Sequence, residues 1–114
     1  MPAALTGPHA AACGMRFYSG SMFPGEYKNQ AFIARRGSWN RTKKIGYDVV
    51  LAKVNGAKAT ITPFMTGFLD PATDAFWGRP VDVHVQPDGS LLVSDEQNGA
   101  IYRVSYSGKV AATR

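Results

Sequence analysis

The chain has 114 residues, which is enough for one compact domain and too few for two of ordinary size. Hydrophobic residues make up 45% and charged residues 18%, and this composition excludes a wholly disordered chain. The net charge of +5 favours anionic partners, but the basic residues are scattered and no nucleic-acid-binding motif surrounds them, so we expect no nucleic-acid partner.

The first half of the chain predicts short strands, because its apolar residues alternate or come in short runs without a helical stripe. The expected strands cover residues 14–18, 31–35, 47–53 and 59–65. Asn55 and Gly56 are a strong hairpin signal between the third and fourth of them. The run Thr60, Ile61 and Thr62 is β-branched, which favours a strand there.

The second half repeats this pattern after a long connection. The expected strands cover residues 80–86, 90–94, 101–106 and 109–112. In the first of these, Val81, Val83 and Val85 fall on one face of the strand. Asp88 and Gly89 predict a tight turn before the next strand. The sequence therefore predicts an all-β chain of two antiparallel four-stranded units.

The two units, about residues 12–66 and 79–113, share a weak internal repeat within one domain of residues 1–114. Repeated four-stranded antiparallel units are typical of β-propeller blades. A single eight-stranded sandwich or barrel fits the strand count equally well. Periodicity leaves both architectures open.

Cys13 is the only cysteine, so no disulfide within the chain is possible, and its small neighbours predict a buried thiol rather than a nucleophile. The first twelve residues lack the charged and apolar regions of a secretion signal. No apolar run is long enough for a membrane helix, so no membrane partner is expected.

Five segments in a fixed order resolve the choice of architecture. They are FYSGSMFPGEY (17–27), AFIARRGSWNR (31–41), TGF (66–68), WGRPVDV (77–83) and DGSLLVSDEQNGAIYRVSY (88–106). Together they resemble the C-terminal region of the pyrroloquinoline-quinone (PQQ)-dependent sugar dehydrogenases, in their L-sorbosone dehydrogenase-like branch. The resemblance covers almost the whole chain, from about His9 to Tyr106.

The resemblance implies that the chain forms two four-stranded antiparallel blades of a six-bladed β-propeller, with PQQ on the top face near the axis. In that family a histidine base takes a proton from the sugar, hydride passes to the quinone, and a calcium ion polarises the cofactor. The base and the calcium ligands lie in earlier blades, and no calcium ligand is identified in this chain. A periplasmic or secreted location is also implied.

Cofactor-binding residues follow from the matched motifs. PQQ carries three carboxylates, so its pocket needs guanidinium groups and amide donors. The resemblance implies Arg41 and Arg79 as anion-binding residues, Asn40 as a donor and Trp39 as packing for the planar ring. His9 falls on a loop that lines the same face.

Arg36 is a departure from the family pattern, which has histidine at this place before GSWNR. The change puts quinone binding in doubt if that histidine contacts the cofactor. An additional arginine can still pair with a carboxylate of the ligand.

Three functions are compatible with these observations. The first is a fragment of a PQQ-dependent sugar dehydrogenase that contributes the C-terminal blades and part of the cofactor wall, and that is inactive alone because it lacks the base and the calcium site. The second is a non-catalytic propeller-blade module that binds an anion, a sugar or another small molecule. The third is a purely structural remnant.

Self-association is the last expectation. Two blades leave two unlike apolar faces uncovered, which either the remaining blades of a longer chain or further copies must cover. Contacts between unlike faces run head to tail and can close into rings. Three copies would supply the six blades of the family's ring, so a homotrimer is the arrangement that we predict.

Overall fold

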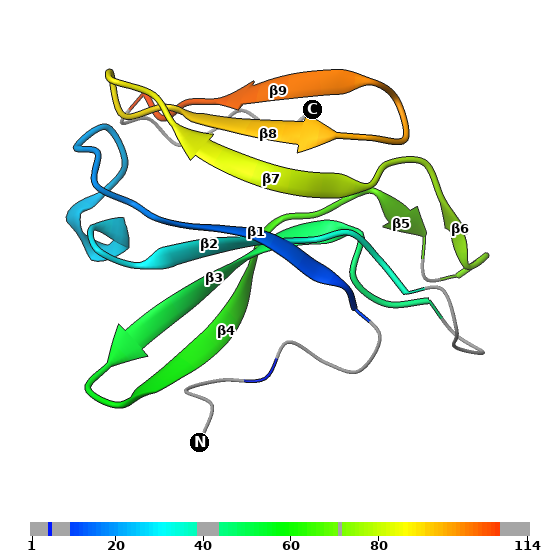
Figure 1. The fold of residues 1–114 in the computed structure, drawn as a ribbon, viewed down its shortest axis with the longest axis horizontal. Coiled ribbons are helices and arrows are strands. Elements are labelled where there is room, and N and C mark those ends of the chain that lie inside the picture. Colours follow the sequence, from blue (N-terminus) through cyan, green and yellow to red (C-terminus); the bar gives the residue numbers. More distant parts are fainter. Residues whose placement is uncertain (1–4, 6–9, 39–43, 71, 108–114) are drawn as a thin grey trace.

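Two antiparallel sheets that pack face to face form the body of the protein (Figure 1). The computed structural model describes residues 5, 10–38, 44–70 and 72–107. The first sheet contains, in spatial order, β1 (Ala12–Phe17), β2 (Ala31–Arg35), β3 (Asp48–Asn55) and β4 (Lys58–Met65). The second sheet contains β7 (Pro80–Val85), β8 (Leu91–Asp95) and β9 (Ala100–Val104).

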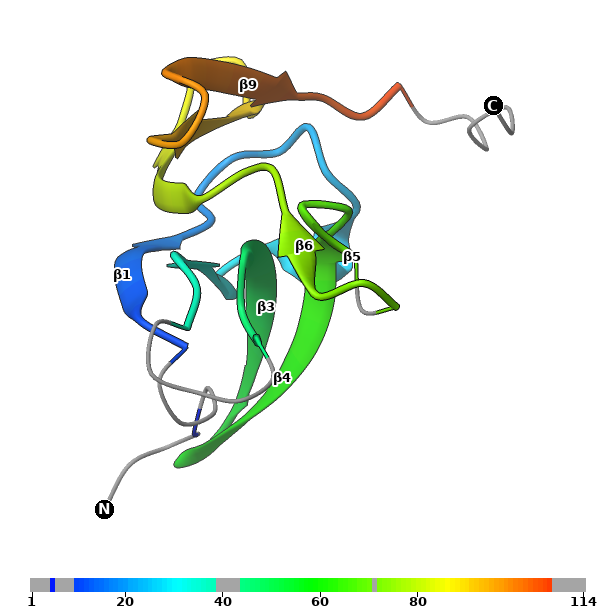
Figure 2. The same cartoon turned by 90° about the vertical axis from the view of Figure 1, so that its right-hand side faces the viewer.

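Two smaller elements connect these sheets. A single 3₁₀ turn, η1 (Gly25–Tyr27), lies between β1 and β2, and a two-stranded hairpin, β5 (Leu69–Asp70) and β6 (Ala75–Phe76), lies between the sheets in sequence. Figure 2 shows this hairpin beside the first sheet, below the chain segment that leads into the second sheet.

The predicted all-β class is confirmed, since every strand pairing in the described residues is antiparallel and no α-helix occurs there. The connection between the two halves differs from the prediction, because it folds back on itself as β5 and β6. Its strands have only two residues each, too short for a periodic pattern in the sequence. The predicted strand at 109–112 lies outside the described residues, and the division into two blades stays a prediction.

The core lies between the two sheets and follows the alternation of each strand. The first sheet contributes the buried side chains of Phe32, Ala34, Val49 and Leu51 to this core. The second sheet contributes Val83, Leu91 and Val93. Aromatic rings extend this core toward η1, where Tyr18, Phe23, Tyr27 and Phe64 surround Phe32. The β-branched and aromatic residues that predicted strands therefore also fill the space between them.

A buried tyrosine ties the two sheets together. The Tyr18 hydroxyl donates a hydrogen bond to the Gly89 carbonyl (2.6 Å) and accepts one from the Phe23 amide (3.1 Å). β1 and β7 also approach each other so closely that a Cβ atom on Gly14 would lie 2.7 Å from the Asp82 Cα. The packing of one sheet on the other is thus fixed by specific contacts as well as by apolar burial.

Cys13 is exposed, so the prediction of a buried thiol is wrong. The small neighbours of Cys13 indicated close packing, but they belong to the edge strand β1, which is exposed along most of its length. Small residues here serve the close approach of β1 to β7 rather than burial of the thiol.

The turn between β7 and β8 contains an acidic side chain with a strongly lowered pKa. The Ser90 hydroxyl and the Ser90 amide both donate to the Asp88 carboxylate, and Arg103 pairs with it at 2.7 Å. These contacts, led by the Ser90 hydroxyl, lower the pKa of Asp88 to about 2. Bonds to the charged form of a carboxylate have this effect generally.

Acid is therefore expected to remove the stabilising effect of Asp88. Because the folded pKa lies below the unfolded one, this stability is complete above about pH 4 and is lost as the pH falls towards 2. NMR titration is expected to give a pKa of about 2 for Asp88, and a higher value in the Ser90→Ala variant. A wild-type pKa near the ordinary value of 3.8 would contradict this assignment.

Candidate functional site

Two of the predicted cofactor-binding residues meet at one end of the sheets. Arg36 follows the last residue of β2, and Arg79 precedes the first residue of β7. Glu96 follows the last residue of β8, which pairs with the start of β7. Antiparallel pairing of β7 with β8 brings Arg79 and Glu96 together, and the packing of the two sheets places Arg36 beside them.

Glu96 lies between the two guanidinium groups. Its Oε1 accepts a hydrogen bond from Arg36 Nε and lies 3.9 Å from Arg79 Nη1. The Glu96 amide donates to the Arg79 carbonyl at 3.1 Å, which fixes the two backbones together. The three side chains carry two positive charges and one negative charge and are partly exposed.

Two aromatic rings lie beneath the Arg79 guanidinium. Its central carbon lies 4.8 Å from the ring centre of Phe76 and 5.8 Å from that of Tyr47. The two rings contact each other with centres 4.5 Å apart. A guanidinium on such a platform keeps one flat face packed while its edge remains available to an acceptor.

The Nε atom of Arg79 is buried and has no hydrogen-bond acceptor among the described residues. A buried donor without a partner is costly, so such atoms occur where a ligand, an ion or a water completes the bonding. The unpaired Arg79 Nε therefore supports the binding of a hydrogen-bond acceptor at the cluster in addition to Glu96.

The loop that contains Trp39, Asn40 and Arg41 begins and ends beside this cluster. These three residues lie outside the described part of the chain. Ser38 and Ile45 close the loop through two hydrogen bonds of 2.9 Å, Ser38 N–H to the Ile45 carbonyl and Ile45 N–H to the Ser38 hydroxyl. The ends of the loop are therefore fixed at the same end of the sheets as the arginines.

Glycine and tyrosine shape this anchor. The Tyr47 hydroxyl donates to the Ser38 carbonyl at 2.7 Å. Gly37 has a φ of 121°, and a Cβ atom at this position would lie 2.5 Å from the Tyr47 ring. Only glycine fits both this backbone conformation and this space.

His9 also lies outside the described residues, but its neighbour Ala10 is placed. The buried Ala10 accepts a hydrogen bond from the Gly37 amide at 2.9 Å, next to Arg36. Of the six predicted residues, Arg36 and Arg79 lie at this end of the molecule, and the other four lie outside the described residues. The structure places Arg36 and Arg79 directly, and places the flanks of His9, Trp39, Asn40 and Arg41.

Asp95 organises the turn that presents Glu96. One carboxylate oxygen accepts hydrogen bonds from the amides of Arg79, Gln97 and Asn98, and the other accepts from the Asn98 side chain and the Tyr102 hydroxyl. Burial raises the pKa of Asp95, but these hydrogen bonds outweigh it and lower the pKa overall. Asp95 is therefore a buried anion that positions Arg79 and Glu96.

Sequence reasoning missed Glu96, Asp95 and the aromatic pair Tyr47–Phe76. Asp95 and Glu96 lie within the segment 88–106 that carries the family resemblance. The sequence around an acidic residue does not show whether its side chain forms hydrogen bonds within a turn or is simply exposed to water. The sequence did contain one signal for the role of Asp95. The turn dipeptide Asn98-Gly99 follows it closely, and an acidic residue just before such a dipeptide often accepts hydrogen bonds from the backbone of the turn.

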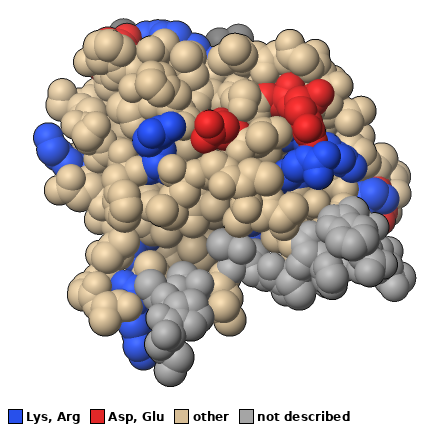
Figure 3. Space-filling model, viewed as in Figure 1, with Lys and Arg blue, Asp and Glu red and all other residues tan. Residues whose placement is uncertain are grey.

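Charge on the visible face is mixed. Figure 3 shows a largely uncharged surface on which acidic and basic side chains lie next to each other toward one end.

Among the described residues, no group of three His, Cys, Asp or Glu side chains is arranged to hold a metal ion. No helix in the same residues is long and apolar enough to cross a membrane. The arginine cluster, with two guanidinium groups beside one carboxylate, is the candidate site among the described residues.

Known proteins match the chain over most of its length. The family model described as TrAA12-like matches residues 1–107. An uncharacterized protein of Borreliella burgdorferi is 42% identical over 101 residues, which cover 86% of this chain and 26% of that protein.

A solved structure also matches. The holo form of the pyranose dehydrogenase PQQ domain from Coprinopsis cinerea aligns with a TM-score of 0.56 at 22% sequence identity, over 87% of this chain and 27% of that one. The chain thus spans about a quarter of the length of the proteins that it matches. This likeness confirms the predicted fold, an all-β part of a β-propeller whose sheets do not close into a ring.

Proposed function

This chain belongs to the TrAA12-like family, and from that premise we propose that it is part of a PQQ-dependent dehydrogenase-like protein. Its role in that protein is to supply two blades and part of the cofactor wall. We further propose that this protein belongs to the L-sorbosone dehydrogenase-like branch of the PQQ-dependent sugar dehydrogenases. Two motifs support this branch: GSWNR, which ends in Arg41, and WGRP, which contains Arg79.

The observation that carries the proposal is the meeting of Arg36 and Arg79 at Glu96, near the ends of the loop that contains Trp39, Asn40 and Arg41. This donor set fits a polycarboxylate, because guanidinium groups bind carboxylates through paired hydrogen bonds. The buried Arg79 Nε supplies an unused donor. The replacement of the family histidine by Arg36 therefore adds a carboxylate-binding group to the wall.

PQQ, when bound, would supply the hydride acceptor for sugar oxidation. The residues of this chain would bind and orient it: Arg36 and Arg79 would hold a carboxylate, while Phe76 packs against the Arg79 guanidinium, whose central carbon lies 4.8 Å from the ring centre. A ligand carboxylate would compete with Glu96, since the Oε1 atom of Glu96 already accepts a hydrogen bond from Arg36 and lies 3.9 Å from Arg79 Nη1. Glu96 would thus lower the affinity of the site.

Binding of PQQ to the purified chain, followed by its absorbance and by calorimetry, tests this. We expect Arg79→Gln to weaken binding about tenfold or more, since it removes a charged hydrogen-bond partner. Glu96→Gln is expected to strengthen binding, because it removes the competing carboxylate. Arg103→Gln is the matched control, since Arg103 pairs with Asp88 at the opposite end of the sheets.

Two further measurements separate the functions. The trimethyl ester of PQQ, which lacks free carboxylates, is expected to bind much more weakly than PQQ. The chain alone is expected to show no sugar oxidation with artificial electron acceptors, because it lacks the positioned base that proton removal requires. Equal affinity for PQQ and its ester, or no effect of Arg79→Gln, would contradict the cofactor wall. Binding of simple sugar acids in preference to PQQ would instead support a non-catalytic anion-binding module.

A further inference from the structure

Two asparagines in turns precede a glycine, and their side chains have different surroundings. Asn55-Gly56 lies at the turn of the β3–β4 hairpin, and Asn98-Gly99 lies in the turn between β8 and β9. A glycine leaves its main-chain nitrogen open to approach, because it has no side chain to shield it. Both asparagines are exposed, so exposure alone does not distinguish them.

Hydrogen bonds hold the side chain of Asn98. Its Nδ2 atom donates to the Trp77 carbonyl at 2.6 Å and to Asp95 Oδ2 at 2.7 Å. Its main-chain amide also donates to Asp95 Oδ1, at 3.3 Å. Turning this side chain toward Gly99 would break both bonds of Nδ2, one of which is to a charged group.

Asn55 has no such bonds. Among the described residues, neither its side chain nor the amide of Gly56 has a hydrogen-bond partner. Gly56 has a φ of 66° at the first position of a two-residue turn, where glycine is favoured. A Cβ atom on Gly56 would meet nothing within 4 Å. The Gly56 nitrogen is therefore open to the Asn55 side chain.

The tip of this hairpin extends beyond the sheet. β2 pairs with β3 only as far as Ala52, so residues 53–55 pair with β4 alone. Figure 1 shows the end of the hairpin projecting away from the second sheet. The Val54 amide donates to Gln30 Oε1 at 2.6 Å, on the strand just before the turn. A two-stranded end opens locally at lower cost than the centre of a sheet, so the turn can rearrange while the core stays folded.

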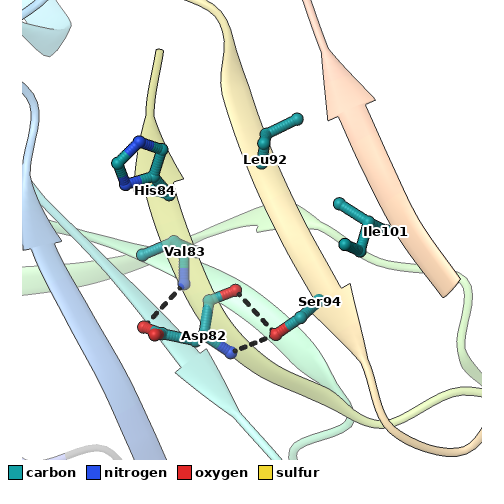
Figure 4. Close-up of a pocket in the computed structure, with 6 residues that line it drawn as sticks. All are labelled: Asp82, Val83, His84, Leu92, Ser94 and Ile101. Atoms are coloured by element: carbon teal, nitrogen blue, oxygen red, sulfur yellow. Dashed lines mark hydrogen bonds between the residues drawn. The ribbon is translucent and has the colours of Figure 1, made fainter. Parts of the chain in front are cut away.

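Closeness of a side chain to the next amide is not sufficient by itself. The Asp82 carboxylate accepts a hydrogen bond from the Val83 amide at 2.9 Å (Figure 4). The Asp82 amide donates to the Ser94 hydroxyl at 3.1 Å, across the pairing of β7 with β8. A carboxylate is a poor electrophile, and the branched side chain of Val83 crowds its nitrogen. Asn55 differs in having a neutral side-chain amide followed by an unshielded glycine nitrogen.

We propose that Asn55 is a site of spontaneous deamidation in the folded protein and that Asn98 is protected from it. The Gly56 nitrogen loses its proton to solvent and forms a bond to Asn55 Cγ. The bond from Cγ to the side-chain nitrogen breaks, and that nitrogen takes up a proton and leaves as ammonia. Water then adds to either carbonyl of the cyclic imide and opens it, which leaves aspartate or isoaspartate. Water is the only co-reactant.

The new carboxylate would lie beside two lysines. Asn55 lines a shallow hollow of about 300 Å³ together with Lys53 and Lys58. Each conversion lowers the net charge of +5 by one and places the negative charge next to these cations. Isoaspartate also inserts one carbon into the main chain, which disturbs the pairing of Asn55 with Lys58. The reaction thus changes both the charge and the geometry of the hairpin tip.

Timed incubation of the purified chain in mildly alkaline buffer, followed by peptide mass spectrometry, tests the proposal. We expect aspartate and isoaspartate to accumulate at Asn55 at least about 30-fold faster than at Asn98, because two side-chain hydrogen bonds of Asn98 must break first. An isoaspartyl methyltransferase labels the isoaspartate product independently. Asn55→Gln is expected to remove the acidic species that ion exchange resolves, and Asn55→Asp marks where the aspartate product elutes.

Unfolding in guanidinium chloride is the control for the fold. Both asparagines are followed by glycine, so their rates are expected to converge once the hydrogen bonds of Asn98 are lost. Similar rates in the folded chain, a faster reaction at Asn98, or an Asn55 that reacts only in denaturant would each overturn the proposal. A difference of the same size in denaturant would also overturn it, because the cause would then be local sequence. None of these results depends on PQQ binding, since Asn55 ends β3 and the arginine cluster lies beside its start.

Discussion

Asp95→Ala is expected to lower the free energy of unfolding by about 3 kcal/mol or more. Asp95 is almost completely buried, and its carboxylate accepts hydrogen bonds from three backbone amides and two side chains. Truncation leaves these donors without an acceptor at the point where β7, β8 and β9 meet. Hydrogen bonds to a charged group contribute more than neutral ones, so their joint loss is large. Urea unfolding followed by circular dichroism measures the change.

The two carboxylate oxygens of Asp95 make different contributions, which a second variant separates. Asp95→Asn keeps the oxygen that accepts the three amides, but it turns an NH₂ group toward the Asn98 side chain and the Tyr102 hydroxyl. We expect it to cost less than Asp95→Ala. Glu26→Ala is the carboxylate control, with an effect within about 0.5 kcal/mol, because Glu26 is well exposed.

The hydroxyl of Tyr102 gives an independent readout. Its pKa is raised, chiefly by the hydrogen bond to Asp95. In Asp95→Ala the pKa of Tyr102 is expected to fall towards its ordinary value, as measured by ultraviolet titration. An unchanged Tyr102 titration together with unchanged stability would show that Asp95 does not organise this turn.

The strands were predictable because their pattern is local. The residues of β2 coincide with the prediction, and the pairing of Asn55 with Lys58 across the β3–β4 turn follows from Asn55-Gly56. Period-two alternation and turn dipeptides need only a few neighbouring residues, and the structure agrees with them to within about two residues at most strand ends. Local chemistry thus determined the all-β class.

Contacts between distant residues were not predictable in the same way. Arg36 and Arg79 were singled out through motif positions, but their meeting at Glu96 depends on how β2, β7 and β8 are arranged in space. The pairing of Tyr18 with Gly89 joins residues 71 positions apart. No pattern in a single sequence encodes such a pair. The candidate site was therefore predictable as a set of residue types and not as a geometry.

The aromatic cluster between the sheets is the second place where a large effect is expected. Phe32 is fully buried on β2 and contacts the rings of Tyr18, Phe23, Tyr27 and Phe64. Phe32→Ala is expected to lower the free energy of unfolding by about 3–5 kcal/mol, the usual cost of truncating a buried phenylalanine. The loss combines the transfer of apolar atoms to water with the cavity that remains among stiff rings.

The surroundings of Phe32 decide how much of that cavity can close. Tyr18 is held by hydrogen bonds to Gly89 and Phe23, so it cannot move into the space without breaking them. Phe32→Leu refills part of the volume and is expected to cost less than half as much as Phe32→Ala. Trp77→Ala removes a larger ring from an exposed position and is expected to change stability by no more than about 0.5 kcal/mol. Equal losses for Phe32→Ala and Trp77→Ala in urea unfolding would mean that the space between the sheets is not the core of this protein.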